Sequence, residues 1–234
     1  TVWRSAPRER RGGEADVRAV ITGARGFVGP HLAAHLEAQG DVVTGLDFAG
    51  PERFDVTDAD GVRGHLDAIA PEVVYHLAAL SHVGESWANP SAQFRVNAEG
   101  TLHVLLACRD AGVGRVLVVS TSDVYGGDGG GGRPLREDAP LRPVTPYAAS
   151  KAAAEQLALQ AWLGWGLEVV RVRPFNHVGP GQDDRFVAGA LAARVAAAET
   201  GDGVVPVGNL TARRDFTDVR DVVRAYRAVL LAGE

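Results

Sequence analysis

Short runs of β-branched residues alternate with helical segments along most of this chain of 234 residues, which limits its fold more than any other feature. The runs predict strands at 17–22, 41–46, 72–79, 115–120 and 167–174. The other segments predict helices at 31–40, 58–70, 90–112, 146–166 and 185–201, and a further helical pattern near residue 234. Strands that alternate with helices form a parallel sheet covered on both faces. Right-handed crossovers then give a doubly wound α/β fold.

Composition excludes several classes of partner. Hydrophobic residues make up 46% and charged residues 23% of the chain, which are ordinary globular values. A net charge of −5 gives no overall basic field for nucleic acid. We expect no membrane contact, because no apolar run approaches the length of a span. We expect a cytoplasmic protein, because the N-terminus lacks a signal peptide and the lone Cys108 fits a reducing compartment as a buried thiol.

Domain organisation follows the same pattern. Residues 1–16 are predicted to be a polar tail and residues 17–175 a dinucleotide-binding domain. The glycine-rich stretch 126–134 is predicted to be a loop. No metal is expected, since His82 and His177 lack ligand spacing. Each of these histidines should line a sugar pocket or pack in a loop.

The stretch "VITGARGFVG" places Gly23, Gly26 and Gly29 between the first strand and its helix. Glycines there allow a tight turn, close approach to a pyrophosphate and close packing of helix on strand. The N-terminus of the helix then presents free N–H groups to the phosphates. Asp47 ends the second strand, where its carboxylate can accept ribose hydroxyls. The spacing predicts a nicotinamide dinucleotide cofactor.

The form of the cofactor stays open between NADH and NADPH. Arg25 in the turn could bind a 2′-phosphate, which Asp47 would repel. In "RFDVTDADG", Asp55 could accept from the adenine amino group beside the Val56 backbone, or both could be loop residues. Asp58 is predicted to be a helix N-cap.

The stretch "VTPYAASKAAAEQ" contains Lys151, the only lysine of the chain, four residues after Tyr147. On a helix begun by Pro146 the two side chains share a face. A nearby cation is expected to lower the pKa of the tyrosine, which would suit it to acid–base work. Lysine is compact enough to serve a ribose hydroxyl as well. Thr121, in "VVSTSDVYG" after the fourth strand, could donate to a substrate carbonyl or cap a turn.

Taken together, "TGARGFVG", "DVTD", "HLAA", "STSDVYG" and "PYAASK" resemble the extended short-chain dehydrogenase/reductases that act on nucleotide sugars. The resemblance runs from about residue 17 to the C-terminus. It implies that Thr121, Tyr147 and Lys151 are catalytic. The implied cofactor contacts are Gly23, Arg25, Gly26, Phe27, Val28, Asp47, Asp55, Val56, Leu77, Ala78, Ala79, Tyr147 and Lys151.

Within that family, "SHVGESWANP", "RPFNHVGPGQ" and "VGNLTARRDFTDVRDVVRAY" resemble GDP-6-deoxy-4-keto-mannose reductases most. This implies hydride transfer from NAD(P)H to the C4 ketone of GDP-4-keto-6-deoxymannose, with Tyr147 as proton donor and Thr121 polarising the ketone. The implied substrate contacts are Ser81, Asp123, Asn176 and Arg214, with Arg214 on the diphosphate.

Other functions on the same scaffold stay open. Dehydratases of the family use a glutamate two residues after the threonine, sometimes with an aspartate before it. This chain has Asp123, one methylene shorter, and Ser122, which is no acid, so the resemblance favours the reductase. A 4,6-dehydratase, a 4-epimerase or a non-catalytic NAD(P)-binding protein are the alternatives. The resemblance also implies a homodimer. It implies that residues 176–234 hold part of a small substrate domain, apparently truncated, and a returning helix of the first domain.

Overall fold

A computed structural model describes residues 17–50, 53–127, 134–201 and 203–232. The predicted tail at 1–16 and residues 128–133 of the predicted glycine-rich loop lie outside the described residues. The main sheet is parallel throughout, with the strand order β2-β1-β3-β4-β5. Its strands are β1 (Arg18–Thr22), β2 (Val42–Leu46), β3 (Val73–His76), β4 (Arg115–Val119) and β5 (Glu168–Val172).

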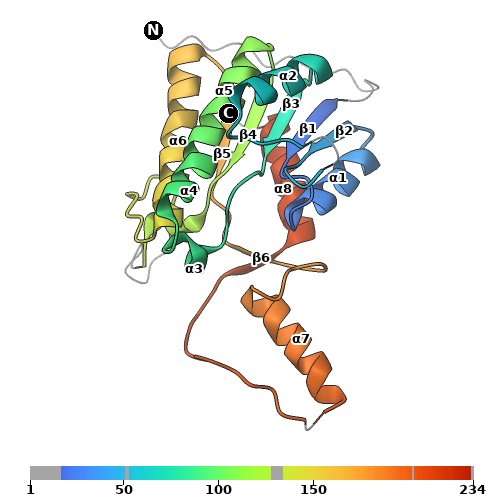
Figure 1. The fold of residues 1–234 in the computed structure, drawn as a ribbon, viewed down its shortest axis with the longest axis vertical. Helices are drawn as coiled ribbons and strands as arrows, with labels where there is room; N and C mark the ends of the chain where they lie inside the picture. The colour runs from blue at the N-terminus through green and yellow to red at the C-terminus, as the bar shows by residue number, and fades with distance from the viewer. Residues whose placement is uncertain (1–16, 51–52, 128–133, 202, 233–234) are drawn as a thin grey trace.

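Helices cover both faces of this sheet (Figure 1). They are α1 (Val28–Ala38), α2 (Ala59–Ile69), α5 (Gly100–Asp110), α6 (Pro146–Trp165) and α8 (Val219–Ala232). Side chains of β1 alternate between the two faces: Ile21 packs with Leu32 of α1 and Leu230 of α8. Val20 instead packs with Leu105 of α5 and the helices α2 and α6. The doubly wound α/β fold predicted from the sequence is therefore confirmed.

The helix predicted at 90–112 is wrong as one uninterrupted α-helix. After the short helix α3 (Val83–Ser86), the chain forms α4 (Pro90–Phe94), a π-helical turn η1 (Arg95–Glu99) and then α5. The Thr101 hydroxyl donates to the Asn97 carbonyl at 2.6 Å, within this widened turn. Hydrophobic periodicity cannot reveal such a turn, because it depends on the polar partners of a single residue.

The part that follows β5 leaves the sheet and returns to it. A second, two-stranded sheet pairs β6 (Asn176–Val178) with β7 (Phe216–Asp218) in parallel. Between them lies α7 (Val187–Glu199), none of whose residues is buried, and Figure 1 shows it well away from the main sheet. α8 then packs beside α1, as expected for the returning helix. The division at residue 175 itself stays a prediction.

Candidate active site

A cleft of about 1500 Å³ opens at the carboxyl ends of the parallel strands. Each strand contributes a residue that lies one or two positions beyond its end: Gly23, Asp47, Leu77, Thr121 and Pro174. In doubly wound sheets, ligands bind in the crevice outside these ends. With the exception of Arg214, every site residue predicted from the sequence lines this cleft.

The glycine turn has the geometry that a pyrophosphate requires. Gly23 has a φ of +71°, and a Cβ there would lie 2.7 Å from the backbone nitrogen of Ala78. A Cβ on Gly29 would lie 2.3 Å from the Ala24 carbonyl oxygen, so only glycine allows the helix to approach the turn. No side chain caps the start of α1. Its N–H groups and positive dipole end therefore remain available to an anion, and the residues present fit a dinucleotide.

Asp47 is fixed at the end of β2 by two backbone donors. The Arg25 N–H donates to one carboxylate oxygen at 2.9 Å, and the Ala49 N–H donates to the other at 3.0 Å. The contact with Arg25 ties the carboxylate to the glycine turn, so both sit on the same side of the cleft. Each oxygen keeps a second lone pair for a ribose hydroxyl.

Asp55 has the loop role that the sequence left open. Its carboxylate accepts from the backbone N–H and hydroxyl of Thr57, which order its own loop. The Thr57 hydroxyl is the largest cause of the lowered pKa of Asp55, and Arg53 contributes as well. Asp55 and Val56 nonetheless line the cleft, so a contact with adenine stays a prediction. Asp58 caps α2 through the Gly61 N–H, as predicted.

Three residues with acid–base potential meet in the cleft. α6 begins at Pro146, and the Thr145 hydroxyl caps it by accepting from the Ala148 N–H at 3.1 Å. This start places Tyr147 and Lys151 one turn apart, with only 9% and 4% of their surfaces exposed. The Thr121 hydroxyl accepts from the Asp123 N–H at 3.2 Å, and its contact with Tyr147 favours the ionised form of the tyrosine.

Burial shifts both ionisable groups towards their neutral forms. It raises the pKa of Tyr147 to about 12, against the opposing effect of the Thr121 hydrogen bond. It also lowers the pKa of Lys151 to about 8, although the charge of Glu155 acts in the other direction. The expected net lowering of the tyrosine pKa is therefore wrong, because desolvation of the phenolate outweighs the groups that favour it.

The residues predicted to contact substrate divide into two groups. Ser81, Asp123 and Asn176 line the cleft. Arg214 is exposed and donates to the carbonyl of Arg213 at 2.8 Å, outside the cleft lining. Its charge still reaches Asp123: burial raises the pKa of that carboxyl, and Arg214 opposes the rise. The diphosphate role of Arg214 stays a prediction.

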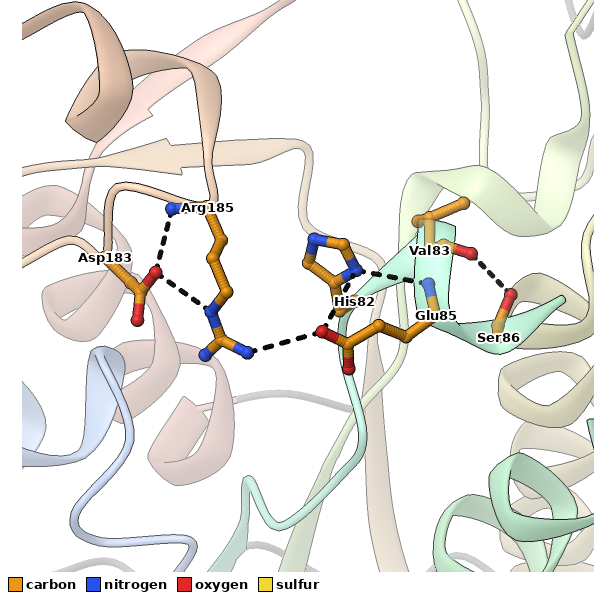
Figure 2. Close-up of polar contacts among 6 residues, drawn as sticks. All are labelled: His82, Val83, Glu85, Ser86, Asp183 and Arg185. Carbon is orange, nitrogen blue, oxygen red and sulfur yellow. Dashed lines mark hydrogen bonds and ion pairs between the residues drawn. The ribbon is translucent and has the colours of Figure 1, made fainter. Parts of the chain in front are cut away.

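The two histidines singled out in the sequence both line the cleft. The His82 imidazole accepts from the Glu85 N–H and caps α3, and its ring makes an edge contact with Phe186. Figure 2 shows Glu85 lying between His82 and Arg185, whose guanidinium also contacts Asp183. His177 instead bonds the Tyr226 hydroxyl at 3.3 Å. Thus His82 lines the pocket and packs in a loop at once.

Sequence reasoning missed a buried polar network beneath the cleft. The Asn97 amide donates to the Leu80 carbonyl, to Gln93 and to Ser150 of α6, and its oxygen accepts from the Leu80 N–H. His76 at the end of β3 lies between Thr22 and Thr101, at 2.7 and 3.0 Å. Burial, followed by the charge of Lys151, lowers the pKa of His76 to about 3. The network fixes the β3 loop against α6.

A second missed group is the ion pair between Glu155 and Arg173. Glu155 is fully buried, four residues beyond Lys151 on α6. Arg173 follows β5 and reaches its carboxylate at 2.7 Å. The spacing Tyr-x-x-x-Lys-x-x-x-Glu could have revealed Glu155, since all three share one helix face.

Two negative observations apply to the described part of the chain. None of its helices is both long and apolar enough to cross a membrane. Within the same residues, no three His, Cys, Asp or Glu side chains gather where they could hold a metal ion.

Known proteins resemble the chain along most of its length. Residues 19–234 match the NAD dependent epimerase/dehydratase family. The GDP-6-deoxy-D-mannose reductase of Pseudomonas aeruginosa is 39% identical over 220 residues, which are 93% of this chain and 71% of that protein. The UDP-glucose 4-epimerase of Mycolicibacterium smegmatis is 34% identical and covers 90% of this chain and 72% of that protein.

Solved structures give the same result. RMD from Pseudomonas aeruginosa complexed with NADPH superposes with a TM-score of 0.81 at 37% identity, over 93% of this chain and 75% of that one. The UDP-glucose 4-epimerase of Thermus thermophilus in complex with NAD has a TM-score of 0.82 at 33% identity, over 91% and 74% of the two chains. The expected nicotinamide cofactor is confirmed at the level of the family, with NADH and NADPH both open. The chain belongs to the NAD dependent epimerase/dehydratase family of nucleotide-sugar-modifying enzymes.

Proposed function

We propose that the chain reduces the C4 ketone of GDP-4-keto-6-deoxymannose to the C4 alcohol, which yields GDP-rhamnose. The nicotinamide cofactor, when bound, supplies a hydride to C4. Tyr147 donates its phenolic proton to the oxygen of the same carbonyl, and the Thr121 hydroxyl polarises that oxygen. One hydride and one proton thus convert the ketone into the alcohol, and solvent returns the proton to Tyr147.

The observation that carries this proposal is that Tyr147 and Thr121 are both buried and both line the cleft. With a pKa of about 12, Tyr147 is protonated at neutral pH, so it holds the proton that a ketone reduction consumes. The phenolate left behind is stabilised by the adjacent Lys151 as long as the lysine keeps its proton. The site therefore favours donation of a proton over abstraction of one.

We propose that the dinucleotide binds along one side of the cleft. The glycine turn and the start of α1 would hold the pyrophosphate, and Asp47 would hold the adenosine ribose. Lys151 would donate to the other ribose, and Leu77 to Ala79 would lie along the cofactor. Arg25 lies on the same side of the cleft as Asp47. The choice between NADPH and NADH would therefore depend on whether attraction of the 2′-phosphate by Arg25 exceeds its repulsion by Asp47.

Identity of the sugar rests on the relatives and on the cleft residues. GDP-6-deoxy-D-mannose reductase is the curated relative at 39% identity. We propose that Ser81, Asp123 and Asn176 contact the sugar, and that Arg214 binds the diphosphate. We also propose a homodimer in the cytoplasm, which size-exclusion chromatography and fractionation would test.

Asp123 supports a second candidate, the 4,6-dehydratase. Burial raises the pKa of this carboxyl, and an acid that keeps its proton more readily next to the sugar could move the proton that dehydration requires. A dehydratase or a 4-epimerase regenerates its oxidised cofactor in each cycle. Purified protein with tightly bound NAD⁺ that does not exchange would favour this candidate.

The test is a direct assay with defined substrate. Protein is mixed with GDP-4-keto-6-deoxymannose and either NADPH or NADH, and the loss of absorbance of the reduced nicotinamide is followed. The proposal predicts oxidation with at least one cofactor and a sugar product reduced at C4. Cofactor binding without oxidation would contradict it, and the ratio of the two rates would show whether Arg25 or Asp47 dominates.

A further inference from the structure

A third side chain continues the catalytic face of α6 into the protein. Tyr147, Lys151 and Glu155 are spaced four residues apart, so they lie above one another on the helix. Exposure falls from 9% at Tyr147 to 4% at Lys151 and 0% at Glu155. A carboxylate without solvent contact is costly unless it is paired, so its presence here needs a reason.

Arg173 supplies the pairing and fixes the carboxylate in place. Its Nε donates to the two carboxylate oxygens of Glu155 at 3.0 and 2.9 Å, and its Nη2 donates at 2.7 Å. Its Nη1 donates to the Tyr125 hydroxyl at 2.9 Å and to the Glu137 carbonyl at 2.8 Å. These contacts join α6 to the segments after β4 and β5, which carry Thr121 and Asn176 into the cleft.

Apart from Glu155, few groups near Lys151 could stabilise its positive charge. On β3, His76 is neutral at pH 7 because burial lowers its pKa to about 3, and it offers no negative charge. Glu155 is the group whose charge raises the pKa of Lys151 against the larger effect of burial. The other titratable side chains on the elements packed against α6 near the cleft are Glu85 on α3, Arg95 and Glu99 on η1, His103 and Cys108 on α5, Asp123 and Tyr125 on η2, and Arg171 on β5.

We propose that Glu155 is a positioning residue whose buried negative charge keeps Lys151 protonated beside Tyr147, while Arg173 holds that charge in place. The inference rests on the proposed function only for its consequence, because a protonated lysine stabilises the phenolate formed during turnover. The effect on Lys151 itself is independent of the substrate.

The composition of the chain allows the protonation of Lys151 to be measured directly. Lys151 is the only lysine, so protein labelled with ¹³C at the ε carbon of lysine gives a single side-chain signal whose pH titration can be followed by NMR. We expect a midpoint near the pKa of about 8 in the natural chain. Glu155→Gln should move the midpoint down by about one unit or more, the usual effect of losing an adjacent opposite charge. An unchanged or higher midpoint would overturn the proposal.

Two further variants separate charge from structure. Glu155→Asp keeps the negative charge and should restore the midpoint towards that of the natural chain. Tyr125→Phe removes a hydrogen bond of Arg173 without changing any charge, and should leave the midpoint in place. A purely structural role for Glu155 would lower thermal stability in its variants without moving the titration.

Folding could fail in Glu155→Gln, because Arg173 would lose its partner. The double variant Glu155→Gln with Arg173→Gln replaces both charges with amides, a change that buried ion pairs often tolerate. It should still show the lowered midpoint, since Glu155 is the charge that Lys151 senses. The titration needs no substrate, so a chain that fails as a reductase could still confirm this inference, and an active reductase could still contradict it.

Discussion

At the scale of single residues, burial has opposite consequences for Tyr147 and Lys151. It raises the pKa of the tyrosine to about 12 and lowers that of the lysine to about 8. A tyrosine that stays protonated at neutral pH is suited to give its proton to a ketone. The lysine is charged at pH 7 but loses its proton as the pH rises through 8. Reduction should therefore slow in mildly alkaline solution.

Replacing Tyr147 tests its proposed role as the proton donor. Tyr147→Phe removes the hydroxyl while keeping the ring, so kcat should fall about 10²–10⁴-fold and the affinity for the cofactor should change little. The matched change Tyr125→Phe removes an equally buried hydroxyl outside the cleft lining. Steady-state rates and cofactor titrations of both variants check this. Equal losses in the two would contradict the role of Tyr147.

The sequence predicted those side chains whose spacing is set within one motif. Tyr147 and Lys151 share a helix face, and the five residues predicted between Gly23 and Val28 belong to one motif, so all of them line the cleft as expected. Glu155 was missed because its significance depends on Arg173, which lies 18 residues further along the chain. The pKa of Tyr147 was misjudged because its burial is a property of the folded cleft.

At the scale of elements, we expect the turn between β1 and α1 to hold the cofactor's pyrophosphate. The turn packs directly against the end of β3, where the Ala78 backbone leaves no room for a side chain at Gly23. Gly64, in the exposed middle of α2, has nothing within 4 Å of an added Cβ. The same substitution at Gly23 and at Gly64 therefore compares a crowded position with an open one.

We expect Gly23→Ala to destabilise the protein and abolish cofactor binding. The positive φ alone costs about 1–2 kcal/mol, and the contact with Ala78 adds to it. Gly64→Ala should stabilise α2 by about 0.5–1 kcal/mol because alanine loses less backbone entropy. Urea unfolding and fluorescence titration with NADPH measure both effects. A Gly23→Ala protein as stable as Gly64→Ala would refute the packing argument.

The bounds of the helices and strands show how far hydrophobic periodicity predicts secondary structure. The strands and most helices were predicted to within a few residues, because burial on both faces leaves clear β-branched runs. The π-helical turn at Arg95–Glu99, from which Asn97 bonds Leu80 in the loop after β3, was not predicted. The pairing of β6 with β7 joins residues 40 positions apart, which no local pattern specifies.

At the scale of the whole molecule, α8 ties the end of the chain to its beginning. Arg227 of α8 contacts Asp41, just before β2, at 2.9 and 3.2 Å. The Asp41 side chain is only 5% exposed, so it depends on this partner. The first domain is thus completed by residues from the far end of the described chain.

Removing this contact should cost more than removing a surface ion pair. Arg227→Met leaves the Asp41 carboxylate buried without its partner, and the free energy of unfolding should fall by about 1–3 kcal/mol, allowing for the partial exposure of Arg227. Arg224→Met breaks an exposed pair with Asp221 on the same helix and should cost less than about 0.5 kcal/mol. Chemical denaturation of both variants measures these two changes in the free energy of unfolding. Equal stability would show that α8 is held by its apolar face alone.

As the proposed reductase, this chain would use up one cofactor molecule in each turnover. The most direct measurement is the ratio of NADPH or NADH oxidised to GDP-4-keto-6-deoxymannose consumed, with both followed in one reaction. The account predicts one cofactor oxidised for each ketone reduced. Consumption of a nucleotide sugar with no net oxidation of the cofactor would contradict it and would assign the site to an epimerase or a dehydratase.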